Sequence, residues 1–169
     1  MNVGVGYLRL MYEYVCWGRE RVLAAAERAP EREYLAARGL DHGSIHETLV
    51  HVFAAEVLWR RRWMGDTDAK LLTAAEAPSL RQLRDPWALE EAKMRAFLTG
   101  VSDAELERQV AYTGTSGAAW AESMWEQMTQ MVVHGVEHRS EVALALTQLG
   151  HSPGFLDFLA FVRERRSSS

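Results

Sequence analysis

The sequence predicts an all-α protein, a four-helix bundle with a short C-terminal helix. Apolar residues recur at intervals of three and four along most of the chain, which is the period of an amphipathic helix. Alternating runs of β-branched residues, typical of strands, are scarce, and the four prolines separate the periodic segments. Four long periodic segments in 169 residues fit a bundle around one core.

The length and composition are those of a single globular domain, which we expect over residues 1–166 with a serine tail at 167–169. No apolar stretch approaches the ~20 residues needed to cross a bilayer, and we expect neither a secretory signal nor a membrane partner. The net charge of −4 argues against nucleic acid as a partner. The only cysteine, Cys16, is expected to be a buried thiol in a cytoplasmic protein.

The first two helices are predicted from their end signals. The first is expected over residues 7–28, because Pro30 cannot continue it. Ser44 followed by Glu47 forms a capping box, which predicts the start of the second helix. Gly65 is expected to end that helix.

The third helix is expected to start at Asp85 and Pro86, with the proline at the first helical position, and to run to Gly100. This leaves a crossover of 20 residues, 66–85, between the second and third helices. Such a long connection also permits an order of helices other than strict up-down-up-down.

The second half of the chain contains one non-helical segment. Ser102 and Glu105 form another capping box and predict one short helical turn. Residues 110–119, with two glycines, are expected to be extended or a loop. A long helix is then expected over residues 120–149, and a short amphipathic helix over residues 155–166.

Two groups of large side chains are interpreted as structural. Trp59, Trp63, Trp120 and Trp125 have helical spacing and are expected in the core or in a pocket wall rather than around a cofactor. The three arginines at 60–62 are expected to form a solvated face whose aliphatic stems cover apolar surface. An anchor for a phosphate or carboxylate is the alternative for these arginines.

His134 and His138 are the first candidate metal ligands. They lie four residues apart, so both imidazoles leave one face of the helix, ~40° apart around its axis. This spacing can offer two nitrogens to one ion, although the same pattern also occurs by coincidence. No glutamate follows His134, which argues against the zinc-peptidase motif.

His51 is a third candidate, because it lies at the edge of the apolar stripe of the second helix. The alternative is a core histidine that is hydrogen-bonded to its neighbours. His46 is five residues earlier and is expected to point ~140° away from it. His42 and His151 lie outside the helices and are expected to be solvated.

Three segments resemble the DinB/YfiT-like superfamily, in the right order and over nearly the whole chain. Residues 12–25 (YEYVCWGRERVLAA) are similar to its first helix, and residues 51–65 (HVFAAEVLWRRRWMG) to its second. Residues 132–153 (VVHGVEHRSEVALALTQLGHSP) resemble its fourth helix, in which two histidines four apart, an arginine and a run to Leu-Gly-x-x-Pro recur. This sequence departs from the pattern at Glu137, often a histidine in the family, and at Ser140-Glu141, commonly Gly-Gln.

The resemblance implies a DinB/YfiT-like bundle in which His51, His134 and His138 hold a divalent transition metal. Three imidazoles leave a position open to water or substrate, as in catalytic sites, and zinc, nickel, iron and manganese all accept such ligands. The resemblance implies a thiol-dependent S-transferase, with a low-molecular-weight thiol such as bacillithiol or mycothiol, or a metal-assisted hydrolase of a small molecule. It also implies a homodimer. The alternative is a non-enzymatic helical module that binds a metal or a ligand and dimerises.

Glu141 is the candidate catalytic carboxylate. It lies three residues after His138 and seven after His134, on nearly the same helix face, where it could orient an imidazole or accept a proton. The alternative is an ion pair between Glu141 and a nearby arginine. Gln130, four residues before His134, shares this face and could bind a ligand or substrate.

Overall fold

Four helices of 19 to 25 residues pack side by side in the computed structural model, which describes residues 4–66, 71–114 and 116–167. They are α1 (Val5–Ala26), α3 (Ile45–Trp63), α4 (Leu80–Gly100) and α6 (Met124–Gln148). Helices α1 and α3 each contact both α4 and α6. The mostly helical character predicted from the sequence is confirmed.

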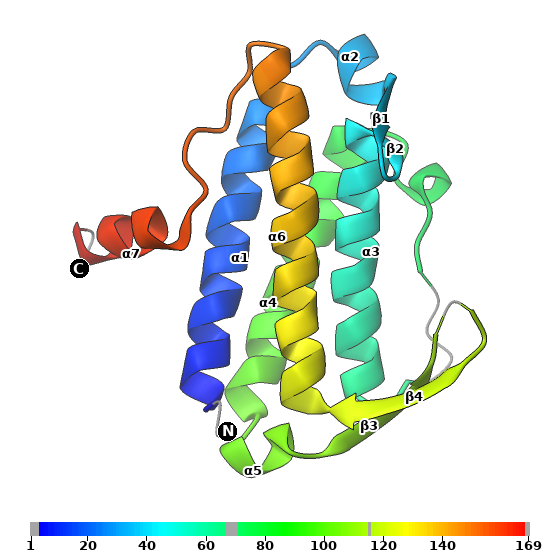
Figure 1. Ribbon diagram of the computed structural model, residues 1–169, viewed down its shortest axis with the longest axis vertical. Coiled ribbons are helices and arrows are strands. Elements are labelled where there is room, and N and C mark those ends of the chain that lie inside the picture. Colours follow the sequence, from blue (N-terminus) through cyan, green and yellow to red (C-terminus); the bar gives the residue numbers. More distant parts are fainter. Residues whose placement is uncertain (1–3, 67–70, 115, 168–169) are drawn as a thin grey trace.

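Shorter elements connect or flank these helices. They are α2 (Glu31–Leu35), β1 (Ala37–Leu40), β2 (Gly43–Ser44), the 3-10 turn η1 (Ala74–Glu76), α5 (Asp103–Leu106), β3 (Gln109–Thr113), β4 (Ala119–Ser123) and α7 (Phe158–Ser167). In Figure 1, α1 and α6 run upward while α3 and α4 both run downward. The long connection between α3 and α4 therefore returns the chain to the same end, which a strict up-down-up-down order would not require.

The core extends along the whole length of the packed helices. Its upper part contains Leu49 and Trp87, and its lower part contains Met94 and Met128. Cys16 is buried in the lower part, as expected. No helix of the described residues is long and apolar enough to cross a membrane.

Three α-helices begin at capping boxes, and the 3-10 turn η1 begins at a fourth, at Thr73. The capping boxes at Ser44 and Ser102 were predicted and are confirmed. In each, the serine hydroxyl accepts a hydrogen bond from the backbone N–H of the glutamate three residues later, and the carboxylate of that glutamate accepts one from the backbone N–H of the serine. The third, at Ser123, starts α6. Trp120 therefore lies outside α6, in β4 opposite Tyr112, and the prediction of a helix from residue 120 is wrong. Hairpin pairing and the cap at Ser123 decide this boundary.

The predicted start of the third helix is also wrong. Helix α4 begins at Leu80, where the Ser79 hydroxyl accepts from the Gln82 backbone N–H, and Pro86 lies inside the helix. A proline removes a backbone donor and displaces the carbonyl four residues before it, here that of Gln82. Both residues are exposed, so water can solvate that carbonyl and the helix continues.

Three further expectations need correction. Arg60 is buried rather than solvated, and its guanidinium makes a two-pronged ion pair with Glu90. Trp120 is 53% exposed and is therefore not a core residue. The last helix, α7, begins at Phe158 rather than 155, and the Asp157 side chain accepts from its first turn.

Candidate metal centre

Three histidines predicted from the sequence lie together at the contact between α3 and α6. The Nε2 atoms of His51 and His134 are 2.8 Å apart. The ring centre of His138 lies 5.1 Å from that of His51 and 4.6 Å from that of His134. The 2.8 Å contact is a hydrogen-bonding distance between His51 and His134. His134 is not in a group of three donors that all lie within 4.8 Å of one another, so among the described residues the predicted triad is close but not preformed as a ligand set.

Arg139, the residue after His138 on α6, is buried against α1. A Cβ atom at Gly18 of α1 would lie 3.1 Å from Nε of Arg139, and one at Gly135 would lie 2.9 Å from its Nη1. The two glycines therefore leave the space that this guanidinium fills. With Arg139 held against α1, His134 and His138 are presented toward α3.

The imidazoles of His51 and His134 are electrically neutral near pH 7. Burial, and next the proximity of the other histidines, lowers the pKa of His51 to about 4. The pKa of His134 is lowered to about 4 in the same way. A neutral imidazole keeps a nitrogen lone pair, which is the form that binds a metal. The donor set therefore fits a transition-metal ion.

Glu141 lies beside His138, one turn along α6. Its Oε2 is 3.1 Å from Nδ1 of His138, and its Oε1 accepts a 2.6 Å hydrogen bond from the backbone N–H of Asp41. Burial acts to raise the pKa of Glu141, but these two hydrogen bonds outweigh it and leave the pKa below its usual value. Within the described residues Glu141 thus pairs with a histidine, not with an arginine.

His42 is the functional candidate that the sequence reasoning missed. It was expected to be solvated, but its half-buried ring stacks on His51 with centres 3.7 Å apart and planes 19° apart. One nitrogen each from His42, His51 and His138 lie within 4.8 Å of one another. Asp41, His138 and Glu141 form a second set within the same distance, although Asp41 is exposed.

The other candidates lie outside this cluster. His46 is buried and its Nδ1 lies 2.8 Å from the Tyr34 hydroxyl, as expected for a histidine that points away from His51. His151 is half-buried beyond α6. Gln130 is exposed on α6.

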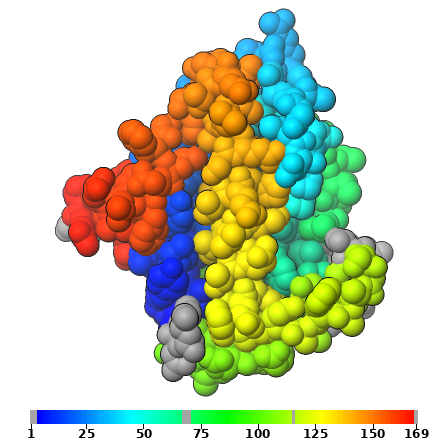
Figure 2. Space-filling model, viewed as in Figure 1, coloured from blue at the N-terminus to red at the C-terminus, as the bar shows by residue number. Residues whose placement is uncertain are grey.

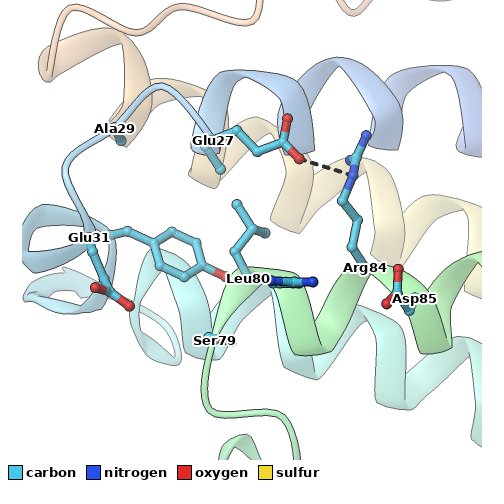
Figure 3. Close-up of a pocket in the computed structure, with 10 residues that line it drawn as sticks. Glu27, Ala29, Glu31, Ser79, Leu80, Arg84 and Asp85 are labelled. Atoms are coloured by element: carbon cyan, nitrogen blue, oxygen red, sulfur yellow. Dashed lines mark ion pairs between the residues drawn. The ribbon is translucent and has the colours of Figure 1, made fainter.

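A cavity of 510 Å³ opens between the end of α1, α2 and the start of α4 (Figure 3). An ion pair of 3.0 Å between Glu27 and Arg84 crosses one side of it. Its lining includes the Tyr34 ring but none of the clustered histidines. The cavity carries charges of both signs but its lining has no histidine or cysteine, so the histidine cluster is the better candidate for metal chemistry.

The sequence was compared with family models and with curated proteins. The model of the DinB family matches residues 1–167. Comparison with curated proteins gives no match. Because the family model covers almost the entire sequence, the chain belongs to the DinB family.

Proposed function

We propose that this chain is a four-helix bundle of the DinB/YfiT type that binds a divalent transition metal through His51, His134 and His138. The observation that carries the proposal is the 2.8 Å separation of the His51 and His134 Nε2 atoms beside His138. Glu141 occupies Nδ1 of His138, so Nε2 is the nitrogen available for a metal. Zinc, nickel, iron and manganese all suit imidazole ligands.

The chemistry follows from this donor set. A bound ion would lower the pKa of a water molecule or a small thiol and so supply a nucleophile near neutral pH. Glu141 orients His138 through Nδ1, the usual role of a carboxylate behind a ligating histidine. Its lowered pKa makes it a weak base, which favours this positioning role over proton removal.

We infer a reaction of a small electrophilic molecule, either S-transfer to a low-molecular-weight thiol or metal-assisted hydrolysis, in the cytoplasm. Three protein ligands would leave one position for the thiol or water. Family membership and the neutral nitrogen donors support metal binding, and the choice of reaction is a proposal about its use.

The first test is metal analysis of the purified protein and of single-alanine variants. His134→Ala and His138→Ala should lose most of the metal, whereas His151→Ala, the matched control, should keep it. Equal metal content in all four proteins would remove the assignment. A screen of the loaded protein with small thiols and electrophiles then tests for turnover, which His138→Ala should abolish.

The second candidate is a non-enzymatic module that binds a metal or small ligand and dimerises. The stacking of His42 on His51 favours it, because this ring covers a candidate ligand.

For the homodimer we propose the outer face of α6, where Val133 and Leu144 are exposed. C2 pairing is the commonest symmetry of such oligomers. Light scattering at micromolar concentration should give the mass of two chains, and Leu144→Glu should reduce it to one.

A further inference from the structure

We propose that His42 is a fourth protein donor to the metal, carried to the site by the turn between β1 and β2. This inference rests on the proposed metal binding by His51, His134 and His138. Its basis is a set of three ligand nitrogens, one each from His42, His51 and His138, that lie within 4.8 Å of one another. His134 is not in this set and is linked to it by the 2.8 Å contact between its Nε2 and that of His51. The ring centres of His42 and His138 are 5.0 Å apart.

The β1–β2 hairpin determines where His42 lies. Leu40 pairs with Gly43, so Asp41 and His42 form a two-residue turn that is separated from α3 only by the two residues of β2. Gly43 has a φ of +94°, which favours glycine, and a Cβ there would lie 2.7 Å from the Glu47 carboxylate. A tight turn of this kind limits how far His42 can move from the N-terminal end of α3.

A second contact holds the turn against α6. The backbone N–H of Asp41 donates to Glu141, whose other oxygen faces Nδ1 of His138. One carboxylate therefore positions a predicted ligand and the backbone next to His42. Figure 2 shows the segment that contains β1 and β2, in cyan, packed along the upper part of α6, and β1 contacts this helix.

The stacked arrangement is not itself a coordination geometry. A nitrogen lone pair lies in the plane of its ring, so rings 3.7 Å apart and only 19° from parallel cannot both aim at one ion. Coordination requires the His42 ring to turn out of the stack. Its nitrogen is already near the other donors, so rotation of the side chain, without unfolding of the turn, is the change that we propose.

A fourth nitrogen alters what the site can do. Three histidines leave a tetrahedral ion with an open position, whereas four close it. With His42 bound, a thiol or substrate must displace this residue or add as a fifth ligand. We therefore assign to His42 control over access to the metal. The exchangeable ligand then comes from the β1–β2 turn, and the ligands that stay bound come from the long helices α3 and α6.

The test is titration of the full-length, metal-stripped protein with Co²⁺, whose visible absorption reports the number and type of ligands. The variants are His42→Ala, His42→Phe and, as a control, His151→Ala. His42→Phe is the decisive one, because phenylalanine can still stack on His51 but has no donor atom. Far-ultraviolet circular dichroism and thermal midpoints verify that each variant is folded.

We expect both His42 variants to bind Co²⁺ at least about tenfold more weakly than the wild type. Removal of a side chain that merely orients a metal ligand already weakens binding by about this factor, and removal of a ligand itself should cost at least as much. Their visible bands should also change, and His151→Ala should match the wild type. Should His42→Phe match the wild type in affinity and spectrum, His42 is only a cover and the proposal is wrong. If His51→Ala nevertheless loses Co²⁺ binding, the proposed three-histidine site still stands and only the role of His42 is rejected. A wild-type protein that binds no Co²⁺, Zn²⁺, Ni²⁺, Fe²⁺ or Mn²⁺ would reject both.

Discussion

Glu141 joins His138 to the backbone of Asp41. One carboxylate oxygen lies 3.1 Å from Nδ1 of the histidine, and the other accepts a 2.6 Å hydrogen bond from the turn between β1 and β2. This residue therefore couples the orientation of an imidazole on α6 to the position of a loop about one hundred residues earlier in the chain. The Asp41 backbone N–H and the His138 Nδ1–H both donate, so both carboxylate oxygens of Glu141 are required as acceptors.

Glu141→Gln should weaken metal binding by about ten- to a hundredfold, the usual effect of losing a partner behind a ligating histidine. A glutamine has only one acceptor oxygen, so its amide N–H₂ must face one of the two donors. Competition with a chelator of known affinity measures the change. Glu137→Gln, at an exposed position on the same helix, is the matched control and should bind like the wild type.

Gly135→Ala should destabilise the protein by about 1 kcal/mol, because overpacking of the buried Arg139 guanidinium, at about 1–3 kcal/mol, exceeds the gain in helix propensity. Gly6→Ala is the control, since a Cβ there meets nothing within 4 Å. It should stabilise α1 by up to about 1 kcal/mol. Urea unfolding of both variants gives these values, and two stabilised variants would show that Arg139 moves aside freely.

The sequence predicted the parts of the fold and site that depend on local spacing. Helical period places His134 and His138 on one face, and the capping box at Ser44 locates the start of the helix that carries His51. Their meeting required pairing of α3 with α6, which the family resemblance supplied. Local rules misplaced the start of α4, because Pro86 is a helix-start signal only when no better cap lies upstream, and Ser79 is such a cap.

His42 could not be placed by the same rules. Its position depends on a two-residue turn and on a hydrogen bond between Asp41 and Glu141, residues that are far apart in the sequence. The one local signal was Gly43 directly before the Ser44 cap, since a glycine there permits a tight turn into the helix. Turn geometry and tertiary contacts, not periodicity, brought this ring to the cluster.

Arg60→Met should destabilise the protein by about 3–5 kcal/mol, because it leaves the buried Glu90 carboxylate without a partner. The neighbouring Arg61 supplies the control. It pairs with Asp66 at the surface, so Arg61→Met should cost no more than about 1 kcal/mol. The double variant Arg60→Met with Glu90→Leu should recover most of the lost stability. Equal losses in the free energy of unfolding for Arg60→Met and Arg61→Met would contradict this account of Arg60.

The Cys16 thiol should make the stability of the protein depend on alkaline pH. Burial raises the pKa of this thiol to about 12, whereas an unfolded cysteine titrates at about 8.5. The folded state holds the proton more tightly, so its stabilising contribution is complete below about pH 8.5 and is lost as the pH rises toward 12. Between pH 8 and 10 the wild type should lose about 2 kcal/mol more free energy of unfolding than Cys16→Ala.

Urea unfolding at several pH values measures this difference, and a thiol reagent at pH 8 provides an independent readout. Cys16 is only 5% exposed and protonated at that pH, so it should react in the native protein at the rate of unfolding and rapidly in urea. The alanine variant corrects for every other group that titrates in this range, because those groups are common to both proteins. Parallel pH profiles for the two proteins, or fast labelling of the native thiol, would show that Cys16 is accessible to water.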